Sequence, residues 1–139
     1  METRLIYWPA VAMVALTLVV WVRMYRARIA QMKREHIHPQ AVATSAQLAA
    51  KLTDSQAADN FRNLFELPVL FYLALVVAAQ TAQVNVLTLA LAWTFVVLRV
   101  AHSFIHCTYN KVIHRFYAYF FGGAVLWALW AVLAYGLLR

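Results

Sequence analysis

The chain has 139 residues, of which 65% are hydrophobic and 12% are charged, and its net charge is +7. Because an ordinary soluble domain contains about a quarter charged residues, this composition predicts an integral membrane protein. One cysteine excludes an internal disulfide and a cysteine-rich metal site, and the basic excess fits loops that set membrane orientation, so we expect no nucleic-acid partner.

Long apolar runs predict an all-α bundle of four membrane-spanning helices, because three glycines and three prolines are too few for the turns of a β-barrel. The first run covers residues 5–22 without a charge, close to the length of about 20 residues that a spanning helix needs. A signal peptide is the competing interpretation, but no small-residue cleavage site follows. The other spans are expected at about 64–82, 84–100 and 116–138, within a single domain of residues 1–139.

A polar and basic loop is expected over residues 23–63. Arg99, Lys111 and Arg115 lie at or near the junction of the third and fourth spans, whereas only Arg4 and Arg139 lie at the opposite ends of the spans. The positive-inside rule therefore places both segments in the cytoplasm, and both termini and the turn at 80–85 on the opposite side. Pro39 should end any continuation of the first helix, because the residue before proline disfavours helix. His36 and His38 are potential metal ligands, but two histidines beside a proline are more often ordinary loop residues.

One polar stretch precedes the second apolar run. Asp59, Arg62, Asn63 and Glu66 lie at positions i, i+3, i+4 and i+7, which predicts a polar stripe on one helix face as it enters the membrane. Pro68 follows, where a kink is tolerable inside a bundle. Lipid cannot be the partner of such a stripe. A ligand site and an internal Arg62–Glu66 pair with hydrogen bonds between helices both remain open.

A second polar stretch joins the third and fourth spans. Arg99, His102 and His106 lie at i, i+3 and i+7 on one helix, and Arg115 and Tyr119 lie at i and i+4 on the next. Charged groups beside apolar segments are costly unless they pair or face an aqueous cavity, so these residues are candidates for a functional site. Alternatively, Arg99 and Arg115 serve only as positive charges that set the orientation of the helices in the membrane. The two histidines lack a third ligand at matching spacing, so we expect no metal site.

The orientation argument brings both polar stretches to the cytoplasmic ends of the helices. This region offers fixed cations in Arg62, Arg99 and Arg115 and an acceptor in Glu66. Such a set suits a small anion whose carboxylates bind arginine and whose amine binds a glutamate. Neither a glycine-rich phosphate loop nor a nucleophile, histidine and acid motif is present. The apolar surroundings suggest that a second substrate arrives from the lipid.

The segments Arg62-Asn-Leu-Phe-Glu66, followed by Pro68, and Arg99-Val-Ala-His102 through Arg115 and Tyr119 resemble motifs of the MAPEG family, the membrane-associated proteins in eicosanoid and glutathione metabolism. The resemblance covers all four spans and is to bacterial members. It implies a four-helix subunit in a homotrimer in the bacterial inner membrane. It also implies that glutathione binds as a co-substrate between neighbouring subunits, near the cytoplasmic face.

The resemblance also implies roles for individual residues. Asn63 and Glu66, with Arg62 beside them, resemble the glutathione contacts of the second helix, and Arg115 and Tyr119 resemble the pair that faces the thiol. The binding residues implied on the third helix are Arg99, His102 and His106. The implied activity is that of a glutathione- or thiol-dependent transferase or peroxidase on a lipophilic electrophile, in which an arginine stabilises the thiolate.

Three positions depart from the family pattern. Asp59 stands where characterised members carry arginine, His106 where some carry tyrosine, and Phe116 where a prostaglandin synthase has serine. These differences concern the identity of the thiol more than the fold. The alternative functions are a non-catalytic membrane ligand-binding protein and a small four-span transporter. The absence of an acidic residue in the first span, at residues 5–22, counts against the transporter.

Overall fold

The computed structural model describes residues 2–138, and that part of the chain contains helices and no strands. The elements are η1 (Thr3–Ile6), α1 (Tyr7–Arg34), η2 (Pro39–Val42), α2 (Ser45–Lys51), α3 (Gln56–Asn63), α4 (Leu67–Gln80), α5 (Val86–Cys107) and α6 (Val112–Leu137). Within these residues four helical segments are long and apolar enough to cross a membrane: Thr3–Arg34, Gln56–Gln80, Val86–Cys107 and Val112–Leu137. The predicted all-α, four-span membrane fold is therefore confirmed.

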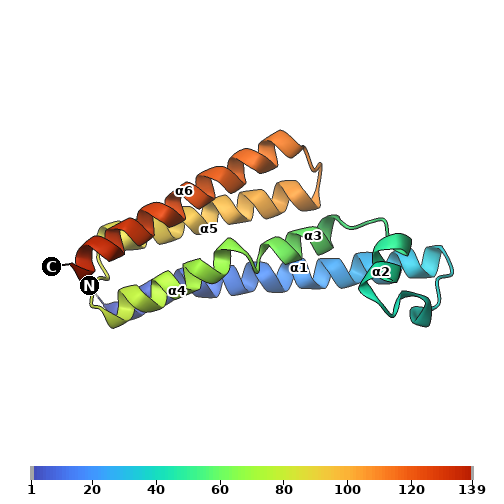
Figure 1. Cartoon of the computed structure of the whole chain (residues 1–139), viewed down its shortest axis with the longest axis horizontal. Coiled ribbons are helices and arrows are strands. Elements are labelled where there is room, and N and C mark those ends of the chain that lie inside the picture. Colours follow the sequence, from blue (N-terminus) through green and yellow to red (C-terminus); the bar gives the residue numbers. More distant parts are fainter. Residues whose placement is uncertain (1, 139) are drawn as a thin grey trace.

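The helices form two neighbouring groups along one long axis (Figure 1). Helix α1 runs beside α3 and α4, and α5 pairs with α6, while contacts of α1 with α5 and of α4 with α6 join the groups. The start of α1, the turn between α4 and α5, and the end of α6 lie at one end, which we call the terminal end. We call the other end, where α3 and the turn between α5 and α6 lie, the basic end.

The core is apolar and the outer surface is apolar too. Phe71 on α4 stacks on Phe95 on α5 with ring centroids 4.4 Å apart, and both side chains are fully buried. Large apolar side chains on the outside, such as Val19, Val97 and Phe120, are more than half exposed. An exposed apolar surface on every spanning helix is expected where lipid, and not water, surrounds the bundle.

Helix α1 is longer than the hydrocarbon layer of a membrane. Its 28 residues measure about 42 Å, against about 30 Å for that layer, so it continues past the hydrocarbon layer at the basic end. The loop that follows folds back onto it, because the side chain of Gln31 binds the hydroxyl of Thr53 and accepts from the backbone N–H of Asp54. These contacts fix the entry into α3.

The prediction that residues 59–66 lie on one continuous helix is wrong. Helix α3 ends at Asn63 and α4 begins at Leu67, with Glu66 between them at φ −96° and ψ −107°. Pro68 is the reason: it has no N–H for the carbonyl four residues earlier, but it fits the first turn of a new helix. A kink at this proline is tolerable inside a bundle, but the structure has a full break between the two helices.

Candidate functional site

A small polar cavity opens at the basic end, between α3, the break before α4, and the facing ends of α5 and α6. Its volume is about 300 Å³, and its lining residues are Asp59, Arg62, Asn63, Glu66, His106 and Arg115. Both sequence stretches contribute to it, although they are separated in the chain by two membrane spans. Five of the eight predicted site residues line this cavity directly.

The other three predicted residues form an interior cluster, which we call the Arg99 cluster: Arg99, His102 and Tyr119. The guanidinium carbon of Arg99 lies 4.9 Å from the ring centre of Tyr119, and the rings of His102 and Tyr119 are 5.7 Å apart. The ring of His106, which lines the polar cavity, lies 5.6 Å from that of His102. The cluster therefore adjoins the polar cavity through the two histidines.

Arg99 is fully buried, yet Nε, Nη1 and Nη2 have no hydrogen-bond partner among residues 2–138. The rings of Phe95 and Tyr119 contact its guanidinium, and each such cation–π contact is worth about 2 kcal/mol when desolvated. The two contacts offset part of a desolvation cost of several kcal/mol, but they give the buried N–H groups no hydrogen-bond acceptor. Tyr119 and Glu66 both act electrostatically on its charge, Tyr119 more strongly, but neither forms an ion pair with it within 4 Å. The arrangement is suited to a polar or anionic ligand that would supply the missing acceptors.

Two histidines also have buried nitrogen atoms without a hydrogen-bond partner among the described residues. His102 Nε2 and His106 Nδ1 are buried and have no partner in the described part of the chain, while His102 Nδ1 lies 3.2 Å from the carbonyl oxygen of Arg115. In residues 2–138 no three histidine, cysteine or carboxylate side chains are grouped so that they could hold a metal ion. The unpaired ring nitrogens of His102 and His106 are therefore available for hydrogen bonds with a ligand.

Arg115 is positioned by a residue that the sequence reasoning missed. Its Nη1 donates to Oδ1 of Asn110 at 2.8 Å. Asn110 lies in the turn before α6 with φ 47°, a left-handed conformation that asparagine adopts more readily than most residues. An asparagine in a short turn between two helices was the available signal for this conformation, but its side-chain partner was not predictable.

A comparison with protein-family models matches the chain to the MAPEG family over residues 6–135. The chain belongs to the MAPEG family. The resemblance identified from the two polar stretches is thereby confirmed, and the match covers nearly the whole chain. Membership supports a glutathione-related membrane function in general terms. Neither a curated protein nor a solved structure matched the chain.

In this MAPEG protein a buried hydrogen-bond network holds α3 against α5. Asn60 is fully buried, accepts a hydrogen bond from Ser103 Oγ at 3.2 Å and donates one to Cys107 Sγ at 3.4 Å. Sequence reasoning missed Asn60, because it lies beside the polar stripe and not on it. Its effect on the site is indirect: it sets the distance between the α3 wall and the α5 wall of the polar cavity.

A second cavity of this MAPEG protein is apolar and lies between α4 and α6, with a volume of about 460 Å³. Leu67, Phe116 and Trp127 line it, and so does Tyr119 of the Arg99 cluster. Tyr119 therefore touches both an apolar space open toward the lipid and the buried cation. The polar cavity, the Arg99 cluster and this apolar cavity together make up the candidate site.

Proposed function

We propose that this MAPEG protein is a membrane-bound, glutathione- or thiol-dependent transferase or peroxidase that acts on a lipophilic electrophile. The observation that carries the proposal is Arg99, a fully buried cation with three unpaired nitrogens beside a polar cavity. A cation without a partner in an apolar bundle is costly, and a bound anion would offset that cost.

The polar cavity supplies complementary groups for glutathione. Arg62 and Arg115 are suited to its carboxylates, because a guanidinium binds a carboxylate through two parallel hydrogen bonds. Glu66 is suited to its ammonium group. Arg62 and Glu66 are exposed in the single chain, which fits a site that a neighbouring subunit completes in a homotrimer.

The proposed chemistry begins with the thiol. An ordinary thiol is mostly protonated at neutral pH, and a neighbouring cation favours the thiolate, which is the nucleophilic form. Arg115 is assigned that role, and the Tyr119 hydroxyl donates a hydrogen bond to the sulfur. The thiol proton passes to solvent as the thiolate forms. In conjugation the thiolate sulfur then forms a bond to the electrophilic carbon, and the leaving group departs with its electron pair. The apolar cavity beside Tyr119 would hold the electrophile.

One observation favours a variant of this proposal. Asp59 lines the polar cavity, and its carboxylate accepts a hydrogen bond from Ser55 Oγ at 2.8 Å. With Glu66 it gives the cavity two carboxylates, which repel the two carboxylates of glutathione. A thiol with fewer negative charges, or a ligand that binds without turnover, fits this feature better.

Isothermal titration of the detergent-solubilised protein with glutathione tests the proposal. We expect saturable binding that Glu66→Ala weakens by about tenfold, because the ammonium loses its carboxylate partner. Glu2→Ala is the matched control, since Glu2 is an exposed carboxylate paired with Arg4 near the start of α1. Absence of binding at millimolar glutathione, or equal binding by both variants, would contradict the assignment of glutathione to this cavity.

A further inference from the structure

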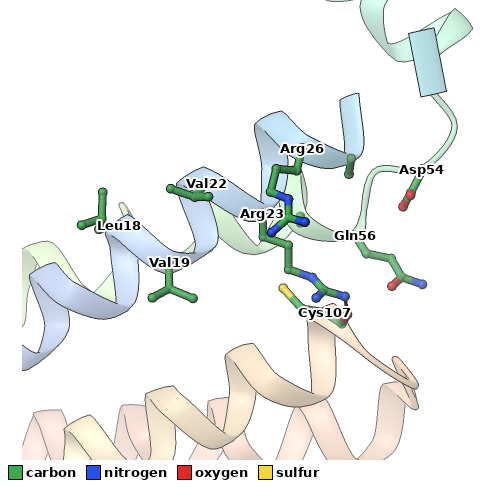
Figure 2. Close-up of a pocket in the computed structure, with 10 residues that line it drawn as sticks. Leu18, Val19, Val22, Arg23, Arg26, Asp54, Gln56 and Cys107 are labelled. Carbon is green, nitrogen blue, oxygen red and sulfur yellow. Dashed lines mark hydrogen bonds between the residues drawn. The ribbon is translucent and has the colours of Figure 1, made fainter. Parts of the chain in front are cut away.

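The largest cavity described lies apart from the candidate site. Its volume is about 730 Å³, and it opens between α1, the start of α3 and the end of α5 (Figure 2). We call it the amphiphilic cavity, because apolar and charged side chains line different parts of it. The residues that matter here are Leu18, Val19, Val22, Arg23, Arg26 and Asp54. None of them lines the polar cavity or the apolar cavity.

The apolar part of the amphiphilic cavity is at membrane depth. Leu18, Val19 and Val22 lie on α1 and are largely exposed in the chain. They end a charge-free run, residues 5–22, that is about 27 Å long as a helix and so nearly spans the hydrocarbon layer of about 30 Å. Arg23 therefore stands where hydrocarbon gives way to the headgroup layer. The cavity crosses that boundary.

Arg23 and Arg26 both have N–H groups without a hydrogen-bond partner in the described part of the chain. Arg23 Nη2 donates to the carbonyl oxygen of Cys107 at the end of α5, which leaves its other N–H groups available. Arg26 has no hydrogen bond or ion pair within residues 2–138. Figure 2 shows both guanidinium groups on the side of α1 that faces Cys107. Two such cations on one wall form a site for a phosphate group.

The loop before α3 contributes a negative charge to the cavity, from Asp54. The backbone N–H of Asp54 donates to Gln31 Oε1 at 3.2 Å, which fixes its place, whereas its carboxylate has no ion-pair partner among the described residues. It lines the same cavity as the arginines but lies beyond ion-pair distance from them. The cavity thus holds opposite charges apart, a pattern complementary to a zwitterion.

We propose that the amphiphilic cavity binds a glycerophospholipid whose headgroup carries a phosphate and a primary ammonium. The phosphate binds Arg23 and Arg26, the ammonium binds Asp54, and one acyl chain lies along Leu18, Val19 and Val22. A water-soluble phosphate ester would leave the apolar wall unfilled. An anionic lipid without an ammonium would leave Asp54 unpaired and opposed to the negative headgroup.

Native mass spectrometry of the protein, released from mixed nanodiscs of phosphatidylethanolamine and phosphatidylglycerol, tests the proposal. We expect preferential retention of phosphatidylethanolamine, reduced about fivefold in Arg26→Gln, since one basic residue near a membrane surface contributes about 1 kcal/mol to lipid binding. Arg34→Gln is the matched control: it removes the same charge from the same helix, outside the cavity. Asp54→Asn should abolish the preference for the ammonium lipid while retention of phosphatidylglycerol persists or rises.

A competition experiment and a comparison of lipid retention distinguish the possible outcomes. Excess glycerophosphoethanolamine, the headgroup without acyl chains, should not displace the lipid, and displacement would overturn the role of the apolar wall. Equal retention of both lipids in the parent protein, or retention that Arg26→Gln leaves unchanged, would overturn the proposal. Arg26 makes no hydrogen bond or ion pair within the described chain, so its substitution should not disturb folding, and thermal unfolding of the variant checks this.

Discussion

Arg115 has two contacts that separate its roles. Its side chain donates to Asn110, and its backbone carbonyl lies 3.2 Å from His102 Nδ1, so substitution of the side chain leaves the second contact available. A residue that acts mainly on the thiolate should affect the reaction more than the binding of the thiol. The structure thus permits a test in which turnover and affinity are read independently.

We expect Arg115→Ala to lower turnover with glutathione and a model electrophile by about a hundredfold, as loss of one group that stabilises developing charge does in other enzymes. Glutathione affinity, measured by titration, should fall by much less. Arg115→Lys should retain intermediate turnover, because it keeps a cation but not the planar fork. Unchanged turnover in correctly folded Arg115→Ala would remove this residue from the mechanism.

Asp59 permits a gain of function. Asp59→Arg should tighten glutathione binding by about tenfold, because it removes a repulsive carboxylate from the polar cavity and adds a cation, each worth up to about 1 kcal/mol near a surface. Asp59→Asn isolates the first of these effects and should give a smaller gain. Titration measures both. If Asp59→Arg binds glutathione no more tightly than the parent protein, repulsion by Asp59 does not limit affinity.

The sequence predicted which residues are functional candidates better than it predicted their partners. Arg99 stood out because an arginine beside an apolar run is costly, and the structure buries it fully. Its contacts with the rings of Phe95 and Tyr119 depend on how α5 packs against α6, which spacing within one helix does not determine. Asn110 was missed for the same reason, because its partner lies on another element.

The spacing of polar and apolar residues correctly predicted continuous helices for α5 and α6. It did not predict the backbone of the segment before α4. Arg99, His102 and His106 lie on one continuous α5, as their spacing predicted. The spacing of Asp59 and Glu66 also fitted one helix, yet the helix is interrupted between Asn63 and Leu67, and both residues still reach the same cavity. A periodic pattern therefore predicted the shared location correctly but gave the wrong backbone between the two residues.

The packing of α3 depends on Asn60. Asn60→Ala should destabilise the protein by about 1–3 kcal/mol, because Ser103 and Cys107 would lose their buried partner while the α3 wall of the site loosens. Thermal unfolding in detergent measures the effect. Gln40→Ala, which removes an exposed amide from η2, is the control and should leave stability nearly unchanged. Equal stability of the two variants would show that the Asn60 network does not hold α3 in place.

The family match and the four apolar spans establish an integral membrane protein of the MAPEG family. The positive-inside rule adds a proposal about orientation, with the basic end in the cytoplasm. The homotrimer is likewise a proposal. It follows from the family resemblance and fits the exposure of Arg62 and Glu66, since a site open on one side needs a second subunit to close it.

We expect the purified protein to have three times the chain mass of 15.9 kDa once bound detergent is subtracted. Light scattering coupled to size-exclusion chromatography measures this mass. Because each proposed site lies between subunits, dilution that dissociates the assembly should abolish glutathione binding as well. A monomeric protein that binds glutathione with unchanged affinity would show that one chain forms the whole site.

The burial of Arg99 also has a consequence for biosynthesis. It lies eight residues, or about 12 Å, before the end of α5, so this span carries a cation well inside the hydrocarbon layer when it enters the membrane. On insertion scales a central arginine costs about 2.5–3.5 kcal/mol. Of its two aromatic partners, Phe95 is on the same helix and Tyr119 is on α6. Only four residues separate α5 from α6, so the two helices can enter as one hairpin, in which the ring of Tyr119 shields the charge from lipid at the translocon.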